Sequence, residues 1–496
     1  MGIIKKLVSQ TAIYGLSSIF GRFLNYLLVP LYTYYFSAAE YGVVSEFYAY
    51  AGFFSVLLLL GFETGYFRFR DKENTQRDVA YSTALLFILL INCVFLAVIM
   101  AVNQQLSSAL SYSHHPEYVL CFSSILILDA IAAIPFARLR AENKAVLFAS
   151  IKIFEILITV LLSLFFIVYC PKLLANNPDA WVKSVYKPEL GISYIFLANL
   201  IASAFKFMVL FPQLLGLRWG FNLALFNKMW RYSLPMVVIG FAGIINEVLD
   251  RALLKYLLPY DLQTNLQMLG IYSACYKLSV LMTLFIQAFR FAAEPFFFAY
   301  ADKNDAKEVY AKVLKYFVIF CVFIFLLVTL FLDFFKYFLG EEFRAGLTIV
   351  PILLMANLFL GIYVNLSIWY KLTDKTLLGA FVSILGALIT VGLNLWWIPS
   401  LGYVGSAWAT LVCYSFMVIV SYSLGQFYYP VAYDLKRILG YIVLGVSLYF
   451  LRSVLPFNAG WQNPLLLSAS LLALYLLVVF LFEKSLLKKP IQSRVI

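Results

Sequence analysis

Long apolar stretches, separated by short polar segments, are the feature that most constrains the fold of this 496-residue chain. A helix needs about 20 mainly apolar residues to cross a bilayer, and fourteen segments meet this requirement. They lie near residues 9–36, 41–64, 79–102, 118–137, 146–169, 191–212, 230–257, 268–294, 313–337, 347–370, 377–398, 402–424, 436–452 and 464–482. No polar stretch between them is long enough for a sizeable soluble domain. The sequence therefore predicts an all-α polytopic membrane protein with about 14 transmembrane helices.

The basic residues predict the orientation of these spans. The chain has 63% hydrophobic and 12% charged residues, with a net charge of +12. Of its 37 Lys and Arg residues, 24 fall on one side of the predicted membrane and 7 on the other. Because cytoplasmic loops are enriched in Lys and Arg, we expect a multi-pass protein with both termini in the cytoplasm. The basic excess then reflects topology, and nucleic acid is not an expected partner.

Cysteine and histidine give no sign of a metal or redox site. The six cysteines are scattered without a Cys-x-x-Cys pair, and His114 and His115 are the only histidines. Two adjacent histidines cannot by themselves supply a metal centre with several ligands. We expect no metal and no cofactor.

Three sequence matches indicate an internal repeat of six spans. Residues 157–167 recur at 388–398, residues 42–45 at 270–273, and residues 190–200 at 401–411. An even number of spans makes the two copies parallel, and parallel repeats are a transporter architecture with the substrate site between the halves. We predict a six-helix lobe at 1–218, a second at 219–430, and two additional helices with a basic tail at 431–496.

Polar residues in the first span share one helical face. Tyr14, Ser18, Arg22 and Asn25 follow one another at intervals of four, four and three residues. A charged group at mid-span costs about 2.5–3.5 kcal/mol on insertion scales, so it usually faces a cavity or a partner. We favour a cavity lining with Arg22 as its cationic centre, against the alternative of a polar seam packed on a neighbouring helix.

The seventh and eighth spans carry most of the remaining deep charge. Glu247, Asp250 and Arg251 lie within two turns, where an ion pair of Glu247 with Arg251 would leave one carboxylate in surplus. A self-satisfied structural pair is equally compatible with this spacing. If the charges are functional, Asp250 or Glu247 would couple transport to H+ or Na+, and Asp129 is the next candidate. Charges near span ends, such as Glu46 and Lys206, are expected to snorkel.

Three cations on repeat-related spans favour an anionic substrate. Arg22, Arg251 and Lys277 would form a cationic chamber if they converge, with Asn25 and Ser18 beside Arg22. Arginine binds phosphate oxygens through a planar fork, and lysine adds a point charge.

Motifs along the whole chain resemble the polysaccharide transporter branch of the multidrug/oligosaccharidyl-lipid/polysaccharide (MOP) exporter superfamily, that is, bacterial Wzx-type flippases. They are Gly21-Arg22, Pro30-Leu31-Tyr32-Thr33, Glu40-Tyr41-Gly42, Asp250-Arg251, Leu269-Gly270-Ile271-Tyr272-Ser273, Tyr276-Lys277-Leu278 and residues 401–407. The resemblance implies two MATE-like six-helix lobes plus two helices, located in the bacterial inner membrane.

The resemblance also implies a cargo and partners. The cargo would be a polyprenyl-pyrophosphate-linked oligosaccharide, such as an O-antigen unit for lipopolysaccharide. The chain would move it to the periplasmic leaflet by alternating access, acting as a monomer among membrane lipids and polysaccharide-assembly proteins. Fewer deep arginines than in lipid II flippases count against lipid II.

Two alternatives of other kinds stay open. A cation-coupled multidrug exporter would require a carboxylate-lined cavity. A membrane-embedded glycosyltransferase or polymerase would need a large external loop with catalytic acids. The external connections here are short, so we do not expect an enzyme.

Overall fold

The protein is a bundle of long helices. The structure, a computed structural model, describes residues 2–70, 77–215, 220–454 and 464–487, with side chains in α1 (Gly2–Tyr35) described from residue 19 onwards. No strand occurs among these residues. Thirteen helical segments within them are long and apolar enough to cross a membrane, and α1, with 34 residues, corresponds to the first predicted span. The prediction of a polytopic all-α membrane protein with about fourteen helices is confirmed.

The helices fall into two compact units, which we describe separately. Unit 1 comprises Met1–Ser273 with Ser383–Ser406, and unit 2 comprises Ala274–Val382 with Ala407–Ile496. The helices up to residue 257 are α1, α2 (Ala38–Leu59), α3 (Phe62–Arg70), α4 (Arg77–Ala109), α5 (Pro116–Ala141), α6 (Ala145–Leu164), α7 (Cys170–Asn176), α8 (Ser193–Leu210), α9 (Pro212–Leu215) and α10 (Leu223–Leu257). The later helices are α11 (Leu262–Tyr300), α12 (Ala306–Leu330), α13 (Leu332–Phe335), α14 (Val350–Leu366), α15 (Ile368–Leu372), α16 (Thr376–Leu401), α17 (Tyr403–Tyr428), α18 (Leu435–Val454) and α19 (Pro464–Leu487). Short 3-10 or π turns cover Phe165–Tyr169, Trp181–Ser184, Pro188–Leu190, Lys336–Phe338 and Glu341–Ile349.

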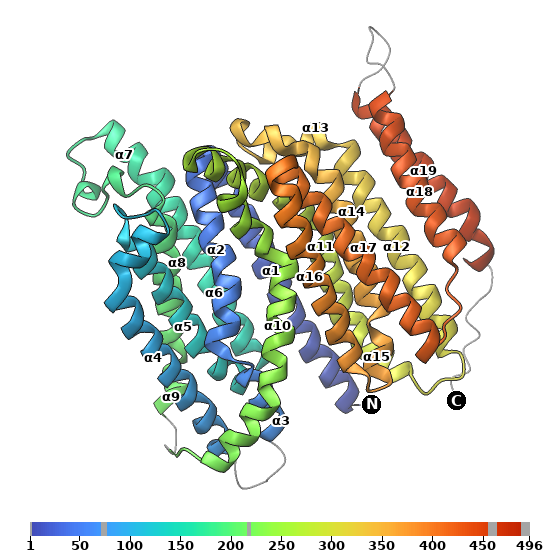
Figure 1. Cartoon of the computed structure of the whole chain (residues 1–496), viewed down its shortest axis with the longest axis horizontal. Coiled ribbons are helices and arrows are strands. Elements are labelled where there is room, and N and C mark those ends of the chain that lie inside the picture. The colour runs from blue at the N-terminus through green and yellow to red at the C-terminus, as the bar shows by residue number, and fades with distance from the viewer. Residues whose placement is uncertain (1, 71–76, 216–219, 455–463, 488–496) are drawn as a thin grey trace. The chain divides into compact units, whose positions relative to one another are not determined.

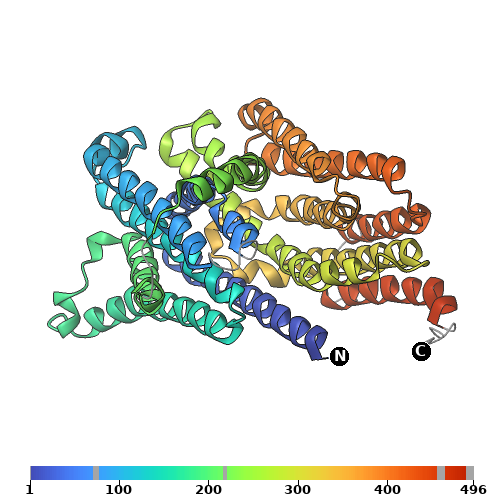
Figure 2. The same cartoon turned by 90° about the horizontal axis from the view of Figure 1, so that it is seen from below.

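Unit 1 is built from helices packed pairwise along their lengths. Helix α1 packs on α6, α5 packs between α4 and α8, and α2 packs on α10. The fully buried Phe47 is central to this packing, with its ring in contact with those of Phe122 and Phe196. The segment around α7 protrudes from these helices in both views (Figures 1 and 2).

Unit 2 has α12 near its centre. This helix packs on α14, α18 and α19. Glu483 of α19 joins three of these helices, because its carboxylate accepts from Lys315 Nζ of α12 at 2.5 Å and from the Tyr441 hydroxyl of α18 at 2.9 Å. The two C-terminal helices are therefore held to α12 by a buried ion pair.

Backbone features recur at positions related by the offsets of the predicted repeat. Asn143 and Asp374 are 231 residues apart, the offset that relates residues 157–167 to 388–398, and both adopt left-handed backbone with φ of 59° and 56°. Their successors donate equivalent hydrogen bonds, Lys144 N–H to Leu139 O and Lys375 N–H to Tyr370 O. Gly191 and Gly402 likewise share positive φ values of 41° and 62°.

Gly42 and Gly270, which the match of residues 42–45 with 270–273 aligns, lie in contact. A Cβ on Gly42 would clash with the carbonyl of Leu266, and a Cβ on Gly270 would clash with the carbonyl of Ala38. Leu266 and Ala38 are themselves related by the same offset of 228 residues. This reciprocity is what a twofold relation between two copies produces, and only glycine allows the approach of α2 to α11.

One predicted span differs in detail. The second span was expected as a single helix over 41–64, but it extends to Arg70 and breaks between α2 and α3. The break lies at Leu60 and Gly61, whose φ values of 43° and 69° end α2 in a left-handed turn. The helix-forming Leu60 gives no sequence signal for this turn.

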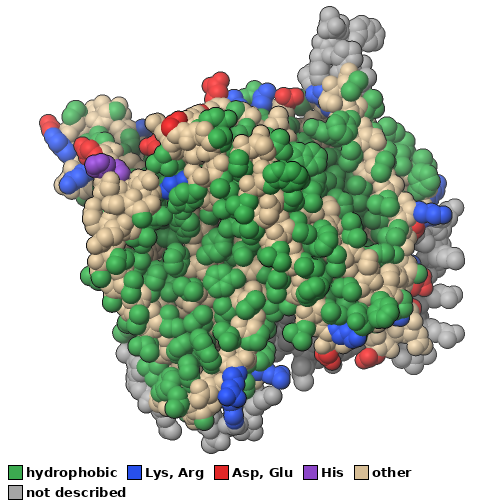
Figure 3. Space-filling view, in the orientation of Figure 1, with side chains coloured by type: hydrophobic (Ala, Val, Ile, Leu, Met, Phe, Trp, Pro, Cys, Tyr) green, Lys and Arg blue, Asp and Glu red, His purple; other side chains and the backbone are tan. Residues whose placement is uncertain are grey.

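The surface is that of a membrane protein. Hydrophobic side chains cover most of the face shown in Figure 3, and charged side chains gather near the helix ends. The six cysteines are free, and no group of three or more His, Cys, Asp or Glu residues that could hold a metal occurs in the described ranges.

Candidate functional site

Helix α1 has two sides of different character around Arg22. At 3.6 residues per turn, one side carries exposed apolar residues, namely Phe20, Phe23 and Leu27. The opposite side carries Arg22 and Asn25, followed by the buried residues Tyr26, Val29 and Tyr32. Arg22 and Asn25 are nonetheless exposed. The inward side of α1 is thus packed at Tyr26 and beyond, and open at Arg22.

Neither Arg22 nor Asn25 makes a hydrogen bond or an ion pair with any residue in the described part of the chain. The neighbouring Gly21 lies so close to α6 that a Cβ there would stand 2.6 Å from Ile156 Cδ1. Packing of α1 against α6 therefore fixes the position of Arg22, while the N–H donors of its guanidinium have no acceptor in the described chain. The predicted site residue Ser18 lies outside the residues whose side chains are described.

Helix α10 holds its two acidic residues in different ways. Asp250 is 4% exposed and accepts from the Tyr272 hydroxyl of α11 and from the Arg251 backbone N–H at 2.8 Å. Glu247 is exposed, and its carboxylate has no partner in the described part of the chain. The surplus carboxylate is Glu247, whereas the spacing alone allowed it to be Asp250.

The ion pair of Glu247 with Arg251, which the four-residue spacing allows, does not form in the described chain. The Arg251 Nη1 donates to the backbone carbonyl of Glu247 at 2.9 Å, and it lies 3.9 Å from Asp250 Oδ1. The guanidinium is thus oriented by a main-chain acceptor and by the neighbouring carboxylate. Arg251 therefore finds its acceptors within one helical turn and does not use the Glu247 carboxylate, which lies four residues earlier.

Tyrosines of unit 1 connect Arg251 with α1. Tyr41 of α2 is buried and lies near Tyr32 of α1 and Arg251 of α10. Tyr48, two turns further along α2, is exposed. Tyr32 itself is buried, with its hydroxyl 3.1 Å from the Ser163 hydroxyl of α6.

Lys277 belongs to unit 2, where it is half-buried on α11. Arg22 and Arg251 belong to unit 1. The structure therefore brings the two arginines into the same unit, and the convergence of all three cations stays a prediction.

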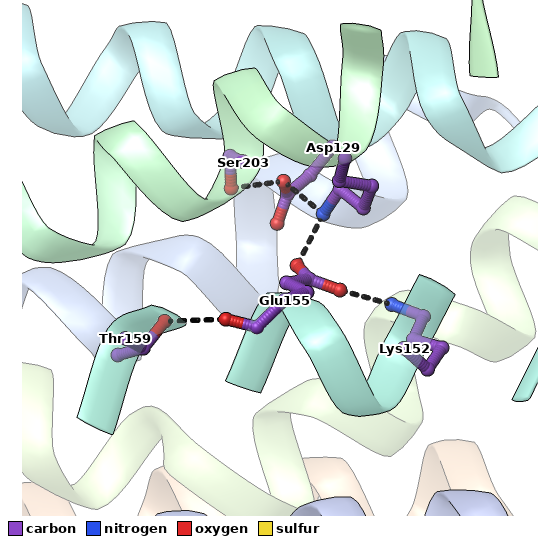
Figure 4. A network of polar contacts seen from close by, with 6 residues as sticks. Asp129, Lys152, Glu155, Thr159 and Ser203 are labelled. Atoms are coloured by element: carbon purple, nitrogen blue, oxygen red, sulfur yellow. Dashed lines mark hydrogen bonds and ion pairs between the residues drawn. The ribbon is translucent and has the colours of Figure 1, made fainter. Parts of the chain in front are cut away.

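Asp129 is part of a partly buried charge network across α5, α6 and α8 (Figure 4). Lys206 Nζ, on a side chain that is 2% exposed, lies 2.6 Å from Asp129 Oδ1 and 2.5 Å from Glu155 Oε1. Lys152 pairs with the other oxygen of Glu155 at 3.2 Å, and the Ser203 hydroxyl donates to Asp129 at 2.7 Å. Two cations and two carboxylates balance, so Asp129 already has a cationic partner.

The expectation that Lys206 snorkels to a span end is therefore wrong. Its partners lie 77 and 51 residues away in the sequence, and spacing along one helix cannot reveal them. The only sign of this network in the sequence is the charge balance of the three spans, which contain two acidic and two basic residues that can neutralise one another.

Glu46 also departs from the expected snorkelling. It is fully buried and pairs at 2.8 Å with Lys255, whose side chain is 1% exposed. Tyr50 donates to Glu46 Oε1 at 2.6 Å, Tyr112 donates to Oε2, and Lys255 Nζ donates to the Leu110 carbonyl at 2.7 Å. This cluster ties α2 and α10 to the connection between α4 and α5.

Comparison with solved structures gives the class of protein. The structure named "Lipid II flippase MurJ, inward closed conformation" matches with a TM-score of 0.74 at 16% identity, over 96% of this chain and 99% of that one. An inward-facing multidrug resistance MATE family transporter of the MOP superfamily matches with a TM-score of 0.62 at 12% identity, over 84% and 94%. An outward-facing conformation of such a transporter matches with a TM-score of 0.60 at 12% identity, over 85% and 95%. The chain is a multi-pass membrane protein with the MurJ and MATE fold.

The family follows from a second comparison. The model of the polysaccharide biosynthesis protein family matches residues 7–301, which is more than half of the chain. The chain belongs to this family, and the resemblance inferred from its motifs is confirmed. No curated protein matches it significantly.

Proposed function

We propose that this chain is a flippase that moves a polyprenyl-pyrophosphate-linked oligosaccharide from the cytoplasmic to the periplasmic leaflet of the bacterial inner membrane by alternating access. The family and the fold support a transporter of lipid-linked sugars rather than an enzyme. The single observation that carries the proposal is Arg22, a deep guanidinium that is exposed and keeps its donors free of protein partners in the described chain.

The exposure of Arg22 argues for water rather than lipid around it. A guanidinium facing hydrocarbon at mid-span is costly, and Arg22 lies on the side of α1 opposite Phe20, Phe23 and Leu27. A hydrated inlet therefore explains both its position and its lack of a partner. Arginine in such an inlet would bind the pyrophosphate through paired N–H donors, while the polyprenyl tail stays in lipid.

The tyrosines beside Arg251 suit the sugar part of the headgroup. Phenolic rings offer an apolar face and a hydroxyl at one end, and Tyr32 of α1 lies near Tyr41 and Tyr48 of α2. We propose that the pyrophosphate binds near Arg22 and Arg251, with Lys277 as a third cation, and that the sugars lie along these rings.

Glu247 is our leading candidate for coupling to H+ or Na+. It is exposed and has no partner among the described residues, whereas Asp250 accepts from Tyr272 and Asp129 from Lys206. A free carboxylate in a cavity can gain or lose a cation without breaking an existing pair. Asp250 and Asp129 would respond only after a hydrogen bond or an ion pair is lost.

Lipid II is a second candidate cargo. The reason is the match to MurJ over 96% of this chain, although the deep arginines are few. Chemical analysis of lipid-linked sugars in cells depleted of the protein separates the two. We expect a polyprenyl-linked oligosaccharide other than lipid II to accumulate on the cytoplasmic leaflet. If no polyprenyl-linked sugar accumulates, the flippase proposal fails.

A variant test addresses the site directly. We expect Arg22→Gln to lower translocation of the accumulating lipid at least about tenfold in reconstituted vesicles, since a charge-assisted hydrogen bond contributes about 1.5–3 kcal/mol. Arg22→Lys should keep part of the activity, because it keeps the charge but loses the fork. Lys172→Gln, which removes a charge from an exposed side chain in α7, is the control. Full activity of Arg22→Gln would refute the role of Arg22.

A further inference from the structure

A small hollow in unit 2 lies between α11 and the α14–α15 segment, and none of its lining residues is assigned to the proposed cavity. Its lining includes Phe289, Arg290, Glu294, Asn365, Ser367 and Lys371. The empty space among these residues, open solvent included, is about 270 Å³. The hollow is therefore a shallow depression open to solvent and not an enclosed cavity, so a ligand there would stay partly in water.

The charges of this hollow do not balance. Lys371 Nζ of α15 pairs with Glu294 Oε1 of α11 at 2.6 Å. Arg290 lies one turn before Glu294, at a spacing that allows an ion pair, but Glu294 pairs with Lys371 instead. Arg290 is exposed and has no hydrogen bond or ion pair with any described residue. Arg290 and Lys371 are thus two cations beside one carboxylate, Glu294, and the N–H donors of the Arg290 guanidinium remain available to a ligand.

The polar groups around Arg290 indicate which kind of ligand the hollow can bind. The carboxamide oxygen of Asn365 is buried and has no hydrogen-bond partner among the described residues. The Ser367 hydroxyl donates to the Val364 carbonyl at 2.6 Å, which leaves its lone pairs to accept. Glu294 and Ser367 offer acceptors to hydroxyl groups, and Phe289 offers an aromatic face.

We propose that this hollow is a second binding site that takes a phosphoryl group carried on a sugar. Arg290 binds the phosphoryl oxygens through its planar fork, and Lys371 adds charge. The sugar hydroxyls donate to Glu294 and Ser367. The identification of the ligand with the cargo headgroup rests on the proposed function. Because Lys371 lies on the predicted cytoplasmic side, the site would receive the headgroup before translocation.

Binding to the full chain in nanodiscs of phosphatidylcholine tests the proposal. The probes are N-acetylglucosamine 1-phosphate, N-acetylglucosamine and inorganic phosphate, with Kd values from saturation-transfer difference NMR titrations. We expect the phosphosugar to bind more tightly than either part alone. Arg290→Gln should weaken this binding at least about tenfold, and Lys303→Gln, which removes an exposed charge outside the hollow, should leave it unchanged.

The Arg22→Gln background separates this site from the proposed cavity. Binding that depends on Arg290 should persist in Arg22→Gln, and both variants should melt within a few degrees of the parent chain. Equal Kd values for Arg290→Gln and Lys303→Gln would overturn the site. Equal affinity for inorganic phosphate and the phosphosugar would overturn the sugar assignment.

Two further results distinguish the sources of the phosphoryl group and the two proposals. If phosphatidylglycerol in the nanodisc displaces the phosphosugar in an Arg290-dependent manner, the ligand is an ordinary lipid headgroup and the cargo assignment fails. A chain that translocates its lipid but binds no phosphosugar through Arg290 refutes this site alone. A chain that binds the phosphosugar through Arg290 but translocates no lipid refutes the proposed function alone.

Discussion

Charged side chains within the spans divide into two groups by burial and pairing. Glu46, Lys255 and Lys206 are buried with partners at hydrogen-bond distance. Arg22 and Glu247 are exposed and have no partners in the described chain. The first group fixes helices to one another, because a charge without a partner in a low-dielectric interior is costly. The second group is available to a ligand or an ion.

The ion pair between Glu46 and Lys255 should be essential for stability. Lys255→Met leaves the Glu46 carboxylate buried without its counterion, and breaking a buried pair in this way costs about 3–5 kcal/mol. We expect a markedly lower Tm for the purified variant in detergent, and Glu46→Gln combined with Lys255→Met should recover part of the loss.

An exposed pair provides the control for this prediction. Lys183 and Asp179 pair at 3.5 Å with side chains 68% and 91% exposed, and such pairs contribute about 0–1 kcal/mol. Lys183→Met should therefore leave Tm nearly unchanged. Equal melting of Lys255→Met and the parent chain would contradict a structural role for the pair.

The sequence could locate these charges but not assign their partners. Arg22 was singled out by its spacing with Asn25 on one helix, and that spacing reports a shared face. Glu46 and Lys255 are 209 residues apart. Their contact depends on how α2 packs on α10, which hydropathy and spacing do not determine.

At the scale of elements, α2 and α11 approach one another more closely than side chains allow. Gly42 and Gly270 face the opposite backbone, and a Cβ at either position would meet a carbonyl oxygen. The sequence match at an offset of 228 predicted that these glycines are equivalent. It did not predict that the two glycines touch, because a repeat specifies equivalent positions and not the axis that relates them.

Alanine at either glycine should force the two helices apart. Overpacking costs about 1–3 kcal/mol where side chains can adjust, and here the obstacle is backbone. We expect Gly42→Ala and Gly270→Ala each to lower Tm by an amount that corresponds to at least about 1–3 kcal/mol of stability. Gly243→Ala is the matched control, because nothing lies within 4 Å of a Cβ at Gly243 and alanine favours helix. If all three variants melt alike, the close approach does not occur in the folded protein.

At the scale of the whole molecule, hydropathy predicted the spans because a bilayer imposes a fixed length on every crossing helix. It could not predict where helices continue beyond the membrane. Helix α10 begins at Leu223 and α11 ends at Tyr300, both outside the apolar windows near 230–257 and 268–294. A helix can continue into water until a capping residue ends it. At the start of α10, the Asn222 side chain provides such a cap by accepting from the Leu225 N–H.

The contact of α2 with α11 also bears on transport. Both helices meet near their first residues, which the positive-inside pattern predicts to lie on the side opposite the cytoplasm. A flippase that releases its cargo there must separate these ends. We expect cross-linking of Ala38→Cys to Leu266→Cys, with a short thiol-specific reagent, to lower translocation more than tenfold, and a reductant should restore it.

Two features make this experiment specific. Cys93 and Cys121 are replaced by serine beforehand, since they are the cysteines that are not buried. The control pair is Phe165→Cys with Trp181→Cys, whose parent rings lie 6.1 Å apart. Phe165 lies directly after α6 and Trp181 in the connection between α7 and α8, so cross-linking them does not join α2 to α11. Under the proposed alternating-access function, the cross-link should hold the chain in one of its two states. Undiminished translocation by the cross-linked chain would mean that α2 and α11 stay together throughout the cycle.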